Sequence, residues 1–175
     1  MVLVFGEMMR RRLVEQAEQA RPEECCGVLL GREVAGQRVV ETVVPARNVA
    51  GGDRCRRYAI DPAVLLAVHR RARETARLVL GYYHSHPADR AVPSAEDARF
   101  AWPDASYAII GMTASGVEVR SWRLPARRAI AEGIAGDVVG DVVSGEVVPG
   151  DGNGLVEEPV RVVTRQAASC KNPES

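Results

Sequence analysis

The stretch LVLGYYHSHPADRAVPSAED, residues 78–97, decides the fold of this chain. It opens with apolar residues typical of a buried strand and runs into His84-Ser85-His86. Side chains two positions apart in a strand project from the same face of a sheet, so the imidazoles of His84 and His86 lie close enough to bind one ion. Two histidines at this spacing are a modest signal by themselves, and a structural role fits them equally well.

The end of the same stretch supplies a carboxylate. A short helix is predicted from Ser94 to Trp102, and the preceding loop brings Asp97, in its first turn, back against the end of the strand. Two imidazoles, a carboxylate and an open fourth position are typical of a catalytic rather than a structural zinc site. The alternative for Ser94 and Asp97 is a capping box, in which each side chain bonds the backbone of the other at the helix start.

Strands and helices alternate along the rest of the chain. Helices are expected from about residue 5 to 20 and from Asp61-Pro62, which is a typical N-cap pair. Strands are expected over residues 26–31, 38–45, 57–60, 106–112 and 116–124, with a turn at Gly36 between the first two. This order predicts an α/β fold in which helices pack on the faces of a mixed β-sheet.

The composition excludes several classes of protein. The 175 residues are 46% hydrophobic and 26% charged, and the formal net charge of zero argues against nucleic-acid binding. No apolar run approaches the roughly 18 residues of a membrane span, and the N-terminal residues lack the order of a signal peptide. Four cysteines without Cys-x-x-Cys spacing favour free thiols in a reducing compartment. We expect a cytoplasmic protein that binds neither nucleic acid nor membrane, with its oligomeric state open.

Residues 126–175 differ in composition from the rest. All eight aromatic residues lie at or before Trp122, and residues 131–175 hold three basic and eight acidic side chains, a net charge of −5. Loose Gly-Asp-Val-Val repeats over residues 136–148 are consistent with an edge hairpin or with irregular structure. We therefore predict a folded domain over residues 1–125 and an acidic, Gly/Val-rich, flexible appendage over 126–175, mostly irregular and dispensable for the fold.

The complete spacing of these residues resembles that of a known family. His84-Ser85-His86, seven residues, Ser94, two residues and Asp97 match the signature of the JAMM (MPN+) zinc metalloproteases. The likeness continues upstream at Pro-Glu-Glu-Cys-Cys-Gly (22–27), at Asn48 and at the segment 58–62, and covers roughly residues 8–124. It implies a cytidine-deaminase-like α-β-α sandwich, the JAMM/MPN fold, and makes residues 1–125 the metalloprotease domain.

The resemblance also implies a role for each site residue. One zinc ion per chain is assigned to His84, His86 and Asp97, where it lowers the pKa of a bound water to about 7. Glu24 is the matching proton acceptor, and the Ser94 hydroxyl is a donor to the oxyanion. The remaining candidates are expected to be structural or solvated: Glu23 on the opposite face, Ser85 pointing away from the metal, His69 within a helix, and Cys25 and Cys26 as packed thiols.

The length of one loop narrows the implied function. Only eight residues separate Asp97 from Ser106, too few for the insertion that eukaryotic deubiquitinases of this family carry there. The chain therefore resembles the compact prokaryotic members, which process ubiquitin-like sulfur carriers. This implies a zinc-dependent (iso)peptidase that cuts the peptide or isopeptide bond after the C-terminal Gly-Gly of such a carrier. An extended tail is expected to pair with a strand edge beside the metal-bearing strand.

A non-catalytic scaffold of the same fold, which binds a ubiquitin-like partner without metal, is the main alternative. Zinc content and the effect of a chelator separate it from the enzyme. Zinc deaminases and gluzincins are excluded, because the chain lacks the His-x-Glu with Pro-Cys-x-x-Cys of the former and the His-Glu-x-x-His of the latter. The identity of the carrier and of the residue released stays open.

Overall fold

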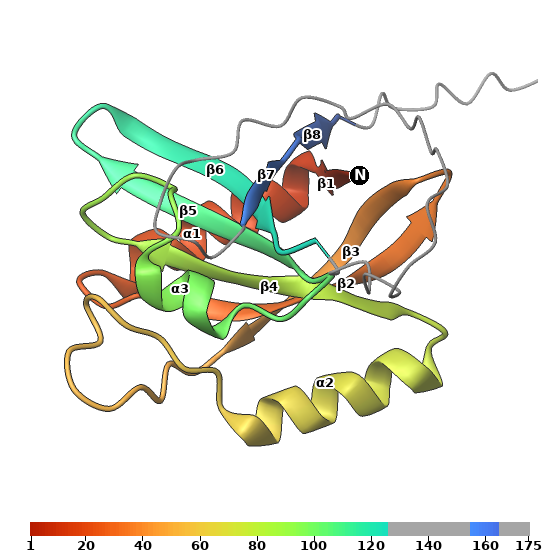
Figure 1. Cartoon of the computed structure of the whole chain (residues 1–175), viewed down its shortest axis with the longest axis horizontal. Helices are drawn as coiled ribbons and strands as arrows, with labels where there is room; N and C mark the ends of the chain where they lie inside the picture. The colour runs from red at the N-terminus through yellow and green to blue at the C-terminus, as the bar shows by residue number, and fades with distance from the viewer. Residues whose placement is uncertain (126–154, 165–175) are drawn as a thin grey trace, which may run out of the picture.

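The computed structural model describes residues 1–125 and 155–164, which form one mixed sheet with three helices. The sheet order is β7-β6-β5-β4-β2-β3-β1-β8 (Figure 1). The elements are β1 (Val2–Gly6), α1 (Glu7–Ala20), β2 (Cys26–Val34), β3 (Gln37–Ala46), α2 (Pro62–Glu74), β4 (Leu78–His86), α3 (Ala95–Phe100), β5 (Ser106–Thr113), β6 (Gly116–Arg123), β7 (Val156–Glu158) and β8 (Val160–Val163). None of these helices is long and apolar enough to cross a membrane. The predicted α/β class and mixed sheet are confirmed.

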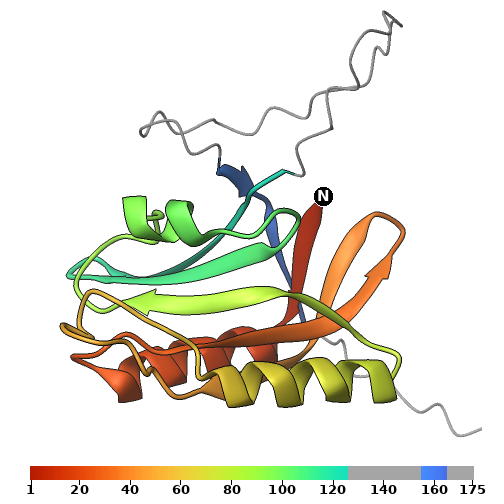
Figure 2. The same ribbon diagram turned by 60° about the horizontal axis from the view of Figure 1, so that its bottom comes forward.

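The alternation of side chains along β2 separates the two faces of the sheet. Leu29 shares a core cluster with Leu13 of α1, whereas Val28 and its neighbour Leu30 pack against Val68 of α2. The apolar side of α3 packs over β5 and β6 in a third cluster. Figure 1 shows α1 behind the strands and α3 in front of them, and Figure 2 shows the layers edge-on. The sheet is therefore covered on both faces.

Strand β4 lies inside the sheet, antiparallel to β2 and parallel to β5. Its alternation sends Tyr83 toward α1, where the tyrosine hydroxyl bonds Gln16. By the same alternation His84 and His86 face the side on which α3 lies. Period-two geometry in one strand thus delivers both histidines to one place.

The loop after β4 is held tightly, and this fixes the position of α3. Trp122 of β6 donates its indole N–H to the carbonyl of Ala91 at 2.9 Å. A Cβ at Gly111 of β5 would lie 2.2 Å from the backbone nitrogen of Ala91, so only glycine permits this approach. The helix that follows is consequently brought back over the end of β4, as the sequence predicts.

Two N-terminal expectations are wrong in detail. The helix begins at Glu7, because Val2–Gly6 forms β1, a buried strand parallel to β3. Residues 57–60 form no strand and contribute only an isolated bridge between Asn48 and Ile60. The backbone of this segment is bound by the Asn48 side chain instead of a strand partner.

The C-terminal segment was expected to be mostly irregular, and its described part is not. Strand β7 pairs with β6 at one edge of the sheet, and β8 pairs with β1 at the other. Leu155 and Glu158 are buried, and Glu157 binds Arg120 through two hydrogen bonds of 2.6 and 2.8 Å. Residues 155–163 therefore belong to the sheet. The repeats over 136–148 lie outside the described residues, and the domain boundary at 125/126 stays a prediction.

Candidate metal centre and active site

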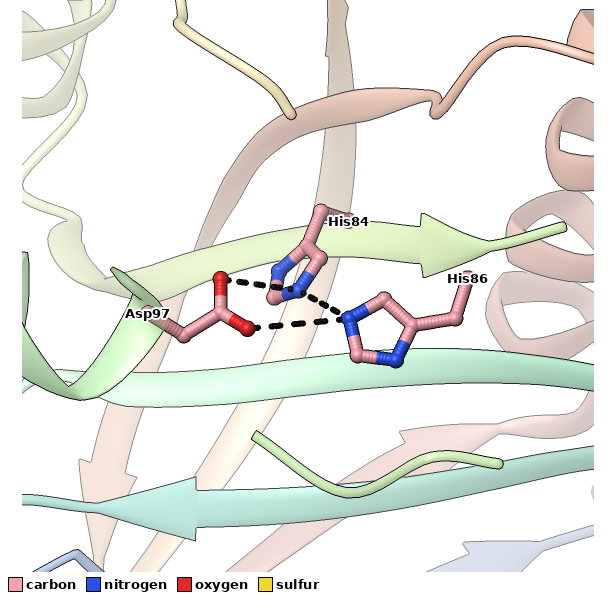
Figure 3. A group of neighbouring side chains, drawn as sticks. All are labelled: His84, His86 and Asp97. Carbon is pink, nitrogen blue, oxygen red and sulfur yellow. Dashed lines mark hydrogen bonds and ion pairs between the residues drawn. The ribbon is translucent and has the colours of Figure 1, made fainter. Parts of the chain in front are cut away.

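Three predicted ligands converge in the structure (Figure 3). The Nε2 atoms of His84 and His86 lie 3.1 Å apart, and the carboxylate of Asp97 from α3 faces both. Its Oδ1 is 3.2 Å from His84 Nε2 and its Oδ2 is 3.6 Å from His86 Nε2. Each residue offers one ligand atom, and these three atoms all lie within 4.8 Å of one another.

The donor set fits a zinc ion. Two nitrogens about 2.05 Å from a tetrahedral ion stand roughly 3.3 Å apart, close to the separation found between the two imidazoles. The Nδ1 of His86 lies 2.9 Å from the carbonyl of Arg90, a contact in which the nitrogen must donate, so Nε2 keeps its lone pair for an ion. Burial raises the pKa of Asp97, but the charge of His84 and the hydrogen bonds from His84, His86 and Ser94 outweigh burial and hold that pKa far below its ordinary value. Asp97 is thus an anion that faces the Nε2 atoms of two imidazoles.

The alternative interpretation of Ser94 and Asp97 is also present. Ser94 Oγ accepts from the Asp97 N–H at 3.1 Å, and the Ser94 N–H donates to Asp97 Oδ2 at 2.8 Å, which completes a capping box. The Ser94 hydroxyl also donates to Oδ2 at 2.7 Å. The cap leaves Oδ1 directed at His84, so the capping bonds do not occupy the oxygen that faces the predicted metal position.

Glu24 lines the same cleft as His86 and Asp97 and is 6% exposed. Burial raises the pKa of Glu24 to about 7, against a lowering by His86. A carboxylate with this pKa is suited to accept and return a proton near neutral pH. The adjacent Glu23 is partly exposed and forms an ion pair with Arg54 at 3.2 Å, as a solvated surface charge does.

A cleft of about 650 Å³ gives access to these groups. One wall is the loop from Cys55 to Ala59, and the other is formed by the loop after His86 together with α3. Phe100 stands on the rim and is 64% exposed. The strands beside β4 are β2 and β5, both internal to the described sheet, so the strand edge expected beside the metal-bearing strand is not there.

The other candidate residues from the sequence lie outside the group of possible metal ligands. Ser85 is fully buried and accepts the Cys25 N–H at 2.9 Å, pointing away from the histidines. Burial raises the pKa of Cys25 to about 11 and that of Cys26 to about 12, so both stay protonated thiols. His69 lies on α2, outside the group of possible metal ligands found among the described residues.

Three contacts were not anticipated from the sequence. The ring of Tyr58 stacks on His84 with centroids 4.3 Å apart, Asn48 binds the backbone of Glu24, and the Arg90 carbonyl orients His86. Tyr58 and Asn48 lie in segments that resemble the family, but no sequence spacing connects them to the histidines. They meet only through the folding of the loop over residues 49–60.

Comparisons with known proteins point to one family. The family model described as prokaryotic homologs of the JAB domain matches residues 6–125. The solved structure of protein DSY2949 from Desulfitobacterium hafniense has a TM-score of 0.69 and 27% identity, and the match covers 93% of each chain. A Salinibacter ruber protein has a TM-score of 0.51 at 29% identity, over 72% of this chain and 84% of that one.

Three named relatives share part of the sequence. The desampylase of Haloferax volcanii is 38% identical over 50% of this chain and 62% of its own length. The CysO-cysteine peptidase of Mycobacterium tuberculosis is 32% identical over 70% of this chain and 83% of its own. The probable TtuB-protein conjugate cleaving protease of Thermus thermophilus is 34% identical over 55% of this chain and 62% of its own.

Proposed function

Because this chain belongs to the family of prokaryotic homologs of the JAB domain, we propose that it is a zinc-dependent peptidase acting on a ubiquitin-like sulfur-carrier protein. It hydrolyses the peptide or isopeptide bond that follows the C-terminal Gly-Gly of the carrier. The observation that carries the proposal is the convergence of His84, His86 and Asp97 beside a cleft that the buried Glu24 also lines. A non-catalytic scaffold has no need to keep these four groups together. The finer fold assignment, a cytidine-deaminase-like sandwich, is supported by helices on both faces of the sheet.

One zinc ion per chain is held by His84, His86 and Asp97. When bound, it acts as a Lewis acid and lowers the pKa of a water molecule to about 7. Glu24 accepts the proton of the attacking water at a side-chain oxygen and then hands it to the departing amine. Burial, which raises the pKa of Glu24 to about 7 in the metal-free protein, makes this carboxylate a stronger base than an exposed one.

Ser94 stabilises the charge that develops on the scissile carbonyl oxygen. Its hydroxyl lines the cleft, and its proton is donated to Asp97 in the absence of substrate. Rotation of the hydroxyl toward the cleft supplies a donor for the oxyanion, while the Ser94 N–H keeps its bond to Asp97 Oδ2. Asp97 therefore remains oriented during turnover.

The substrate class follows from the relatives and from the cleft. Two relatives are named for action on CysO-cysteine or on TtuB-protein conjugates. Glycine has no side chain, so a Gly-Gly tail passes along a narrow groove where larger residues clash. The body of the carrier then rests at the rim, where Phe100 is 64% exposed, and reaches Trp102, two residues further along the chain and 67% exposed. Specificity comes from the groove and from this rim together.

The test is hydrolysis of a Gly-Gly-ended carrier bearing one or a few extra residues, read by intact mass. We expect release of those residues by the zinc-loaded protein, and its loss with chelator. Glu24→Gln should keep zinc and lose activity by several orders of magnitude. Glu23→Gln is the matched control, because the neighbouring carboxylate is exposed and paired with Arg54. Equal loss in both variants contradicts the role of Glu24, and equal cleavage after the glycines are replaced by valine contradicts the groove.

A further inference from the structure

The two histidines of the site are oriented by different means. The Nδ1 of His86 is fixed by the Arg90 carbonyl at 2.9 Å. The Nδ1 of His84 is buried and has no hydrogen-bond partner among the residues that the structure describes. Histidines that bind metals nearly always use the second ring nitrogen to hold their orientation. His84 must therefore be held by packing.

The packing partner of His84 is Tyr58. The two rings stack with centroids 4.3 Å apart and an interplanar angle of 17°. His84 is fully buried at the centre of the sheet, and Tyr58 covers it on the side of the cleft. The stacked ring limits rotation of the imidazole about χ2, which a hydrogen bond at Nδ1 does in other sites.

Tyr58 lies in an irregular segment, and Asn48 holds that segment. Both N–H groups of the Asn48 amide donate, one to the Arg57 carbonyl at 2.9 Å and one to the Glu24 carbonyl at 3.1 Å. Its Oδ1 accepts the N–H groups of Ala50 and Ala59 at 3.0 and 3.2 Å. The residues on either side of Tyr58 and the backbone of Glu24 are thus bound to one buried amide.

We propose that Asn48 and Tyr58 are positioning residues that align the general base with a metal ligand: Asn48 ties the backbone of Glu24 to the segment that presses the Tyr58 ring against His84. The inference rests on the proposed function for the role of Glu24, but not for the alignment of His84. Only an amide of this length satisfies all four bonds, since aspartate lacks the two donors. The ring of Tyr58, rather than its hydroxyl, makes the contact that matters.

Metal affinity tests the alignment without any substrate. Zinc is titrated into the full-length protein in competition with a chromogenic chelator. We expect Tyr58→Leu to weaken zinc binding about tenfold or more, as loss of a partner that orients a ligand does, and Tyr58→Phe to restore it. Asp61→Ala, which removes the N-cap bond of α2 to Ala63, is the control for a general loss of stability. It should lower the melting temperature and leave zinc affinity within about twofold.

A double-mutant cycle tests whether Asn48 acts through Tyr58. Asn48→Ala should weaken zinc binding by a factor similar to Tyr58→Leu, and the double variant should be little weaker than either, because both changes release the same ring. If the losses of zinc affinity in the two single variants add up in the double variant, Asn48 does not act through Tyr58. Unchanged zinc affinity in folded Tyr58→Leu protein also refutes the proposal, and this result needs no Asn48 variant. With a substrate that the wild type cleaves, Asn48→Ala should also reduce kcat on the order of 10²-fold, because Glu24 is displaced. Inactive wild-type protein would refute the proposed function and leave the zinc comparison intact.

Discussion

Replacing Glu24 by glutamine should stabilise the metal-free protein, and by an amount that depends on pH. The side chain is 6% exposed, and burial raises the pKa of Glu24 from 4.5 to about 7. Between these two values the folded chain binds the proton more tightly than the unfolded chain, so the free energy of unfolding falls as the pH rises. Above pH 7 the free energy of unfolding has fallen by its full amount, because the folded protein then holds Glu24 as a buried anion.

The size of the effect follows from the same two values. At 1.36 kcal/mol per pH unit, the rise from 4.5 to about 7 corresponds to roughly 3 kcal/mol. Glutamine does not titrate and leaves no buried anion. The Glu24→Gln variant should therefore match the wild type near pH 4.5 and exceed it by roughly 3 kcal/mol above pH 7, which is about 6–12 °C in Tm for a domain of this size.

Differential scanning calorimetry of chelator-treated protein across this pH range is the measurement. The chain is long enough to keep a core without metal, so both proteins should unfold cooperatively. Added zinc should reduce the stability difference between Glu24→Gln and the wild type, because a cation near Glu24 favours the charged form of this side chain. Glu23→Gln is the control for the substitution itself, since that side chain is 43% exposed and paired with Arg54. A stability difference between Glu24→Gln and wild type that is constant with pH would refute the reasoning.

Three further outcomes are expected. His84→Ala or His86→Ala should remove most of the zinc measured by atomic emission, and full occupancy in the double variant would contradict the ligand assignment. Ser94→Ala should slow hydrolysis on the order of 10²–10³-fold as a lost oxyanion donor, whereas a residue that only caps the helix would cost about 1 kcal/mol of stability with turnover intact. A chain ending at Ile130 should melt at least about 2–4 °C below one ending at Thr164, because it lacks β7 and β8; equal melting by circular dichroism would show these strands to be dispensable.

The sequence predicts the convergence of His84, His86 and Asp97 because two local signals place these side chains. Alternation in β4 puts His84 and His86 on one face, and the helix signal at Ser94 places Asp97 in the first turn of α3. Both signals lie within twenty residues, so no long-range contact has to be guessed. Family membership, first indicated by that spacing, is confirmed by the match over residues 6–125.

The sequence fails where distant segments meet. Strand β1 is short, and its neighbours β3 and β8 come from residues 37–46 and 160–163, so no local pattern marks it as a sheet strand. Strands β7 and β8 follow a long Gly-rich segment that suggests irregular structure, and their register depends on partners in β6 and β1. The role of Asn48 is missed for the same reason, because one of its four side-chain hydrogen bonds reaches Glu24, far from it in the sequence, and no local pattern links the two residues.

The capping box and the metal ligand are one arrangement, and this constrains the chemistry of Ser94. A hydroxyl has a single proton, and here Ser94 gives it to Asp97 Oδ2 at 2.7 Å. To donate to an oxyanion the hydroxyl must withdraw that proton, which would leave the carboxylate oxygen short of a donor. The Ser94 backbone N–H, 2.8 Å from the same oxygen, prevents this. In the proposed mechanism, the helix cap therefore lets Ser94 release its hydroxyl to the substrate while Asp97 keeps its orientation toward His84 and His86.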